Sequence, residues 1–278
     1  MTIEQKLTRS AFKDLAEGNS QFALEHMCDL VKTAEDVAPL ETAILQLAVT
    51  GRLTRSTEQD EPVEELLLRI KPEALDSWPL VDAKGNPKPE PYALPVQWRW
   101  VMLGALLTNI EAGWSPSAQA RPKEGDEWGV LKVSACSWGE FRPGENKALK
   151  EGQLPRTELE VQTGDFLISR ANTAELVARS VVVAETPPHL MLSDKTLRLK
   201  VGDGCCPRYL NLANRAAVAR AHYEDEASGT SSSMKNVSQR AIRRTPIPLP
   251  PREEQDRIVA IVDELMGLLL KLRVEMAA

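Results

Sequence analysis

The chain has 278 residues, of which 42% are hydrophobic and 27% are charged, and its formal net charge is −6. This length is enough for one large domain or two smaller ones, and the composition is that of an ordinary globular protein. No segment approaches the ~18 consecutive apolar residues of a membrane span, and the N-terminus lacks the apolar stretch of a signal peptide. We therefore expect the chain to stay in the cytoplasm, away from any membrane.

Charge is unevenly distributed along the sequence. Residues 91–250 contain 20 of the 34 Lys and Arg residues and 17 of the 40 Asp and Glu residues, which gives this segment a net charge of +3 and leaves −9 for the rest. A mildly basic segment permits DNA binding without demonstrating it. The four cysteines and three histidines have no metal-ligand spacing, and two of the cysteines, Cys205 and Cys206, are adjacent. We therefore expect reduced thiols, no metal site and no cofactor.

Helical patterns dominate residues 1–75. Short amphipathic helices are predicted over Ile3–Leu15 and Phe22–Val31, and another over Val63–Ile70. Between them, a helix is predicted from Pro39, a residue suited to a first helical turn, to the stop signal Gly51. Its apolar face consists of Leu40, Ala43, Ile44 and Leu47. These stripes fit a plain helical bundle and a partner-docking surface equally well.

The pattern changes after a proline-rich stretch. Prolines crowd residues 71–95 and predict an extended linker, which we place at 76–92. From Trp98 onward, short β-type runs alternate with turn residues. The predicted strands are Gly129–Val133, Phe166–Ser169, Ser180–Val183 and Thr196–Leu199, and an alanine-rich helix is predicted over Tyr209–Tyr223. The sequence thus predicts an α+β protein in which a mixed α/β domain over residues 93–249 is flanked by helical regions.

A proline tract, Pro246-Ile-Pro-Leu-Pro-Pro251, turns directly into the last predicted helix. Prolines forbid a helix before Pro251, and Glu253 and Glu254 suit the positive end of a helix dipole. The apolar residues that follow are spaced alternately four and three apart, which is typical of a helix lying along another helix. These seam residues are Ile258, Val262, Leu265, Leu269, Leu272 and Met276. Residues 250–278 are therefore expected to form a coiled-coil type of helix that packs against N-terminal helices of the same chain or of a partner.

Five parts of the sequence carry a resemblance to a known family. They are Ile44-Leu-Gln-Leu-Ala-Val-Thr-Gly-Arg-Leu53 with Asp60-Glu-Pro-Val-Glu-Glu-Leu-Leu67, Leu94-Pro-Val-Gln-Trp-Arg-Trp-Val-Met-Leu-Gly104, Gly164-Asp-Phe-Leu-Ile-Ser-Arg-Ala-Asn-Thr173, Ser228-Gly-Thr-Ser-Ser-Ser-Met-Lys-Asn236 and Pro248-Leu-Pro-Pro-Arg-Glu-Glu-Gln-Asp-Arg-Ile-Val259. In this order they resemble the specificity subunits of type I restriction–modification systems, with a target-recognition domain at 93–249. The resemblance implies a subunit that holds two methyltransferase subunits and a translocating restriction subunit on one bipartite sequence of double-stranded DNA.

Candidate DNA-contacting side chains lie in three segments of the recognition domain. Base edges are read by Arg, Lys, Asn, Gln, Ser and Thr, whereas phosphates attract cations and hydroxyls. The candidates are Ser115, Gln119, Arg121 and Lys123 in one loop, Arg170, Asn172 and Thr173 just beyond a strand, and Ser231, Ser232, Ser233, Lys235 and Asn236 in another loop. We expect the second and third sets to share one basic face. Each loop could instead be a surface loop that contacts nothing.

Sequence motifs for catalysis are missing. The chain has no Asn/Asp-Pro-Pro-Tyr/Phe loop of an adenine methyltransferase, no phosphate-binding Gly-x-x-x-x-Gly-Lys-Ser/Thr and no Gly-x-Ser-x-Gly elbow. Only Glu145-Asn-Lys147 hints at a nuclease. The chain by itself is therefore expected not to be an enzyme, with catalysis, methyl donor and ATP belonging to partners. The alternatives are an interaction protein, with dimerising helices and a protein-binding β domain, and a standalone nuclease.

One recognition domain is predicted where members of this family usually have two. The chain is then either a natural half subunit that pairs with a copy of itself, or the front half of a longer chain. The lack of a helix stop signal at Met276-Ala-Ala278 favours the second interpretation.

Overall fold

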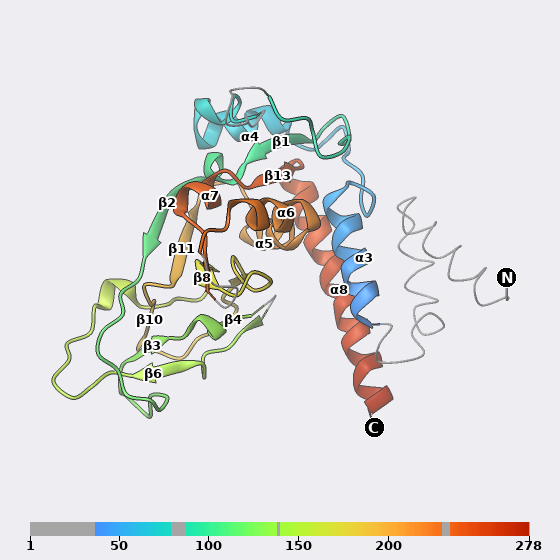
Figure 1. Cartoon of the computed structure of the whole chain (residues 1–278). Coiled ribbons are helices and arrows are strands. Elements are labelled where there is room, and N and C mark those ends of the chain that lie inside the picture. The colour runs from blue at the N-terminus through green and yellow to red at the C-terminus, as the bar shows by residue number, and fades with distance from the viewer. Residues whose placement is uncertain (1–36, 79–86, 138–139, 230–233, 278) are drawn as a thin grey trace.

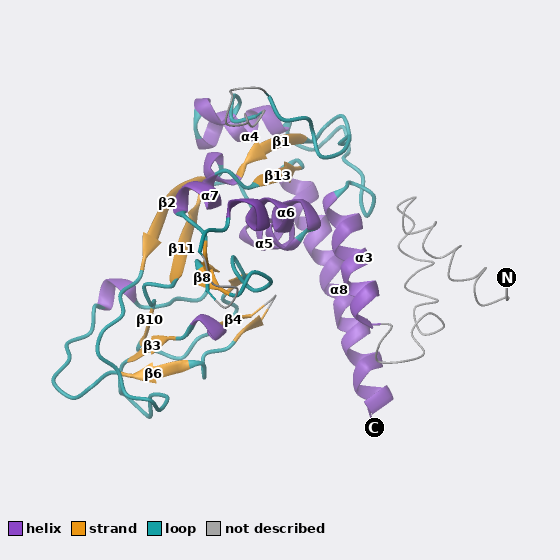
Figure 2. Ribbon diagram, viewed as in Figure 1, coloured by secondary structure: helices purple, strands orange, loops and turns teal. Residues whose placement is uncertain are grey.

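The computed structural model describes residues 37–78, 87–137, 140–229 and 234–277. Figure 1 shows two helices, α3 and α8, that run side by side in opposite directions, with the sheets to one side of them. Figure 2 shows that further helices cover the inner end of the sheets, next to this helical pair. The expectation of a mixed α/β domain with flanking helices and a long C-terminal helix is confirmed. The helices expected over Ile3–Leu15 and Phe22–Val31 lie outside the described residues.

In the described part of the chain, two helices come first, eleven short strands follow, and helices with two further strands end the chain. The α-helices are α3 (Val37–Val49), α4 (Val63–Ile70), α5 (Pro207–Arg215), α6 (Ala217–Glu226), α7 (Gln239–Arg243) and α8 (Arg252–Ala277). The strands are β1 (Arg99–Met102), β2 (Leu107–Ala112), β3 (Gly129–Leu131), β4 (Cys136–Ser137), β5 (Glu140–Phe141), β6 (Asn146–Ala148), β7 (Phe166–Ser169), β8 (Ala171–Asn172), β9 (Ser180–Val182), β10 (Leu190–Met191), β11 (Thr196–Val201), β12 (Lys235–Asn236) and β13 (Pro246–Leu249). Short 3₁₀ turns cover Pro72–Ala74, Leu103–Ala105, Val133–Ala135 and Thr157–Leu159.

The central sheet is antiparallel, in the order β2-β11-β7-β9. Side chains on successive residues of a strand point to opposite faces, and here both faces of β7 are buried. Phe166 and Ile168 join the main core with the helices, whereas Leu167 joins a second apolar cluster under the smaller sheet. This explains why the predicted strand Phe166–Ser169 is apolar at almost every position rather than at every second one.

A smaller mixed sheet lies beyond the central one, in the order β10-β3-β6. Strand β10 runs parallel to β3, and β6 runs antiparallel to it. A two-stranded ribbon formed by β8 and β12 lies close to the end of the central sheet (Figure 1). These two elements bring together segments that are far apart in the sequence.

The two ends of the mixed α/β domain meet. Strand β1 pairs antiparallel with β13, and Trp100 lies opposite Pro248. Prolines suit this ribbon because they need no ladder partner on an edge strand. The chain therefore enters and leaves the domain at one place, and α8 begins there beside the segment that follows α3.

Helix α8 packs along α3 of the same chain (Figure 1). The predicted seam residues Ile258, Val262, Leu265 and Leu269 are each at most 3% exposed, and Leu272 is partly buried. The side chain of Met276 lies outside the described residues. The same apolar core contains residues of α4, α5 and the central sheet. Helix α8 therefore belongs to the same apolar core as α3 and the central sheet as far as Leu269.

The prediction of a single helix over Tyr209–Tyr223 was wrong. The chain breaks at Ala216, whose backbone is extended, and forms α5 and α6 instead. Tertiary contacts override the helix propensity of the alanines. Asn214 donates to the Ala178 carbonyl and the Ser180 hydroxyl, and Tyr223 folds back to donate to Asn214 Oδ1 at 2.6 Å.

Other predicted strands differ only at their ends. Strand β3 stops at Leu131 because a 3₁₀ turn begins at Val133, β9 stops at Val182, and β11 continues to Val201. The described helices include none that is long and apolar enough to cross a membrane.

Candidate nucleic-acid interface

The β8–β12 ribbon consists of Ala171–Asn172 and Lys235–Asn236. Lys235 lies opposite Asn172, and Asn236 lies opposite Ala171. The two segments therefore adjoin each other, although more than 60 residues separate them in the sequence. A two-stranded β-ribbon is one of the elements that fit into the major groove of DNA, and Asn and Lys are side chains that can read base edges there.

Hydrogen bonds fix the backbone of this ribbon and leave polar groups on its side chains. Asn172 Oδ1 accepts from the Thr173 amide at 2.9 Å, and its Nδ2 has no partner among the described residues. Lys235 Nζ donates to the Gly229 carbonyl at 2.8 Å, and Asn236 exchanges backbone bonds with Ser228. The candidates Ser231, Ser232 and Ser233 lie outside the described residues.

Arg170 connects the ribbon to the loop before β11. Its amide donates to the Lys195 carbonyl at 2.9 Å, and its own carbonyl accepts from Val237. Its Nε is buried and has no hydrogen-bond partner in the described part of the chain. Because Ser115 donates a hydrogen bond to Asp194, and because Lys195 and Arg170 add positive charge nearby, the pKa of the Asp194 carboxyl is lowered.

The loop over residues 113–123 uses most of its candidate side chains internally. Arg121 forms a two-pronged ion pair with Glu127 at 2.6 Å, which lowers the pKa of Glu127 to about 2. Gln119 Nε2 donates to the Leu149 carbonyl at 2.9 Å, and Lys123 Nζ donates to the Gly125 carbonyl at 2.7 Å. The Gln119 bond attaches the loop to the residue that follows β6, and the other two stay within the loop and the turn after it. Ser115 is the candidate of this loop that lines a groove.

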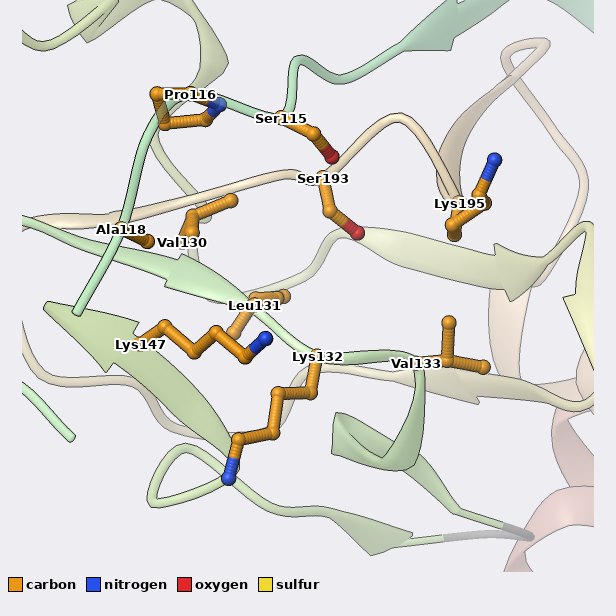
Figure 3. A pocket seen from close by; sticks show the side chains of 10 residues that line it. All are labelled: Ser115, Pro116, Ala118, Val130, Leu131, Lys132, Val133, Lys147, Ser193 and Lys195. Carbon is orange, nitrogen blue, oxygen red and sulfur yellow. The ribbon is translucent and has the colours of Figure 1, made fainter. Parts of the chain in front are cut away.

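This groove has a volume of about 340 Å³ and lies between the smaller sheet and the loop before β11 (Figure 3). We call it the lysine groove. Its apolar floor comes from the loop and from β3, and its polar groups are two serine hydroxyls and three lysines. The lining residues are Ser115, Pro116, Ala118, Val130, Leu131, Lys132, Val133, Lys147, Ser193 and Lys195.

The three lysines are not among the DNA-contact candidates predicted from the sequence. Lys132 follows β3, Lys147 lies within β6 and Lys195 precedes β11, so no local motif connects them. Only the pairing of β3 with β6 and with β10 brings them to one groove. The periodicity of a single sequence contains no signal for this strand pairing.

The weak nuclease hint at Glu145-Asn-Lys147 finds no support in the described residues. Glu145 accepts from Ser134 at 2.7 Å and pairs with Lys132 at 3.5 Å, and these contacts lower the pKa of its carboxyl. No group of three or more His, Cys, Asp or Glu side chains in the described ranges could hold a metal ion. Glu145 is therefore a structural partner of Lys132.

Comparisons with known proteins identify relatives of this chain. A family model described as the type I restriction modification DNA specificity domain matches residues 212–273. The type I restriction enzyme EcoEI specificity subunit of Escherichia coli is 34% identical over 263 residues, which cover 91% of this chain and 44% of that subunit. The EcoAI specificity subunit of E. coli is 26% identical over 94% of this chain and 45% of that protein.

A solved structure shares the fold. The HsdS subunit from Thermoanaerobacter tengcongensis superposes with a TM-score of 0.50 at 20% identity, over 99% of this chain and 53% of that one. The chain thus spans about half the length of the relatives that it matches. By its sequence, the chain is therefore similar to type I restriction enzyme specificity subunits, and residues 212–273 match the DNA specificity domain of that family.

Proposed function

We propose that this chain is a DNA-sequence specificity subunit, or half of one, that directs methyltransferase and restriction subunits to a target site on double-stranded DNA. The observation that carries the proposal is the 34% identity to the EcoEI specificity subunit over 91% of the chain. The pairing of β8 with β12 supports it, because this pairing brings Lys235, Asn236 and Asn172 together on a ribbon of the right shape for a DNA groove.

The proposed domain organisation follows from the same relationship. Residues 93–249 are the recognition domain, residues 1–75 and 250–278 are the helical regions that connect it to partners, and residues 76–92 are a linker. Within the recognition domain, Arg170, Asn172 and Thr173 with Lys235 and Asn236 contact DNA. The loop over residues 113–123 approaches the same DNA through Ser115, while its other polar residues hold the loop in shape.

Catalysis belongs to partners in this proposal. The chain selects DNA in the cytoplasm, and methyltransferase subunits modify the selected site while a restriction subunit cleaves elsewhere. A second copy of the chain supplies the other half-site if the chain works as a half subunit. Exposed apolar residues on α8, Leu270 and Val274, lie on the surface of the helical pair and are available for such assembly.

DNA selection by the purified chain tests the proposal. Short duplexes of randomised sequence are retained on the chain at low salt, eluted and sequenced over several rounds. We expect one short sequence pattern to be enriched, and retention to fall steeply between about 50 and 200 mM salt because phosphate contacts release counterions. A chain that retains no duplex at low salt, or enriches no pattern, is instead an interaction protein, and the proposal is then wrong.

Methylation assays test the division of labour. The chain alone should transfer no methyl group from a labelled donor, and methylation should begin when a cognate methyltransferase subunit is added. The methylome of a host with and without the gene should then differ at one sequence pattern. Methyl transfer by the purified chain, abolished by a substitution within it, would show that the chain is an enzyme.

A further inference from the structure

The lysine groove collects positive charge from three separate segments. Lys132 and Lys147 reach it from the β3–β6 side, and Lys195 reaches it from the loop before β11, with Ser115 and Ser193 between them (Figure 3). Lysine side chains supply only hydrogen-bond donors, and serine hydroxyls can donate as well. The groove therefore favours a ligand that carries acceptors and negative charge.

The lysines keep most of their charge available to such a ligand. Lys147 is exposed and has no ion pair among the described residues. Lys132 pairs with Glu145 at 3.5 Å, and Lys195 pairs with Asp194 at 3.1 Å, but each side chain in these pairs is between 34% and 46% exposed. Exposed ion pairs contribute about 0–1 kcal/mol, so either lysine can leave its carboxylate for another anion at little cost.

The shape of the groove favours a polymer over a small molecule. Small-molecule pockets are enclosed and largely apolar, with a few convergent polar groups, whereas this groove is partly open to solvent. It also lies next to the β8–β12 ribbon, because the carbonyl of Lys195 accepts from the amide of Arg170, the residue that precedes β8. A ligand lying in the groove would extend directly onto the ribbon.

We propose that the lysine groove binds the phosphodiester backbone of the DNA strand whose bases the β8–β12 ribbon contacts. This inference rests on the proposed function and divides the interface into two parts. The groove supplies affinity for any sequence through Lys132, Lys147 and Lys195, because phosphate contacts carry no sequence information. The ribbon supplies discrimination between sequences. The groove also sets the register of the backbone relative to the ribbon.

The test compares two duplexes, the sequence enriched by the wild-type chain and a scrambled version, over a range of salt concentrations. In the variant K132A/K147A/K195A, affinity for both duplexes should fall together and their ratio should stay constant. The log–log salt slope should flatten by about 2 to 3, since each lost phosphate contact contributes about 0.9. The matched control is Lys271→Ala on α8, which removes the same type of charge far from the groove and should leave affinity and slope unchanged.

A second variant with a single charge reversal gives a test that does not depend on the folding of the triple variant. Lys147→Glu changes an exposed side chain without a described ion pair, so its melting temperature should equal that of the wild type. Affinity for both duplexes should fall by about tenfold or more at low salt. Suppose that the wild-type protein binds and discriminates between the two duplexes, and that Lys147→Glu and the triple variant have the same affinities and salt slope as the wild type. The groove assignment is then wrong and the proposed function survives. If the wild-type chain retains no duplex, the proposed function itself fails. A loss of discrimination in the triple variant at unchanged salt slope would also overturn the inference.

Discussion

The indole Nε1 of Trp98 donates a hydrogen bond of 3.0 Å to the carboxylate of Glu254, which is completely buried. Trp98 lies just ahead of β1, and Glu254 lies in the first turn of α8. The same carboxylate accepts from Thr54 at 2.7 Å and from Ser56, both in the segment after α3. One buried side chain thus connects the segment after α3, the residue that precedes β1 and the start of α8.

We predict that Glu254→Ala destabilises the chain by at least about 2 kcal/mol. The substitution leaves three donors without an acceptor, and at least the Thr54 and Trp98 groups are buried, where an unsatisfied donor costs about 1–3 kcal/mol. Urea unfolding followed by circular dichroism measures the change. Glu253→Ala is the control, because Glu253 is exposed and accepts one bond, from the Glu61 amide at 3.2 Å. Equal midpoints for the two variants would contradict the prediction.

A second contact at this junction predicts a pH dependence. Arg257 donates to both oxygens of Asp60 at 2.6 and 2.9 Å, and this hydrogen bonding lowers the pKa of Asp60 below its usual 3.8. A carboxyl whose pKa is lower in the folded state stabilises the fold above the unfolded-state pKa, and this stability is lost as the pH falls through the folded-state pKa.

Asp60→Asn should therefore reduce the free energy of unfolding by about 1 kcal/mol at neutral pH. The difference from wild type should shrink below the unfolded-state pKa of 3.8 and vanish once Asp60 is protonated in the folded wild type as well. Denaturant titrations at a series of pH values measure both. Glu58→Gln, at an exposed position without an ion pair in the described ranges, should match wild type throughout. A difference that stays constant with pH would mean that the Asp60–Arg257 pair does not stabilise the fold.

The helical seam gives a third prediction with an internal control. Leu265 and Leu269 on α8 are completely buried, whereas the neighbouring Leu270 is 62% exposed. Leu265→Asp and Leu269→Asp place a charge in the core and should each cost more than about 3 kcal/mol. Leu270→Asp should leave the melting temperature of the isolated chain almost unchanged. If all three variants have the same melting temperature, Leu265 and Leu269 do not pack in the core as described.

Sequence periodicity predicted these helices because their packing depends on local spacing. The 4-3-4 spacing from Ile258 to Leu269 specifies one buried stripe, and this stripe is what packs on α3. Strand β7 was found from its apolar run, which two buried faces produce. By contrast, the break at Ala216 depends on Asn214 bonding to Ser180, a tertiary contact that propensity cannot predict.

The candidate interface was only partly predictable for the same reason. Loop chemistry pointed to Asn172 and Lys235 but could not show that they lie opposite each other. The chemistry of Arg121 also suggested DNA contact, whereas the structure pairs its guanidinium with Glu127. The lysines of the groove have no common motif, and their convergence depends on strand pairing over long sequence separations.

Substitutions in the ribbon should separate affinity from discrimination. Lys235→Ala should weaken binding of enriched and scrambled duplexes alike and flatten the salt slope by about one unit, because a cation near DNA meets phosphate more often than bases. Asn172→Ala or Asn236→Ala should instead reduce the difference in affinity between the two duplexes, since a base-edge contact contributes about 1–3 kcal/mol of discrimination. Filter retention over a salt series measures both quantities. If all three variants bind and discriminate like wild type, the ribbon faces solvent and these site assignments fail.

The position of the ribbon should depend on Arg220 of α6. Its Nη1 donates to the Val177 carbonyl at 2.7 Å and its guanidinium lies 5.7 Å from the Tyr223 ring, so α6 holds the loop that follows β8. Arg220→Ala should release this loop. The ratio of the affinities for the enriched and the scrambled duplex should then fall by about tenfold, which is within the range of one base contact. The affinity for scrambled DNA and the salt slope should hardly change. If Arg220 contacted phosphate, its loss would lower this affinity and flatten the slope.

Arg220→Lys should restore part of the discrimination, because lysine can reach one carbonyl but lacks the planar fork that fixes the guanidinium. Arg208→Ala is the matched control, since Arg208 pairs with Asp263 on α8 at 2.6 Å and does not touch the loop. Full discrimination by Arg220→Ala, at the melting temperature of wild type, would show that the loop keeps its position without α6. A loss of affinity for both duplexes, with a flatter salt slope, would instead make Arg220 a direct phosphate contact.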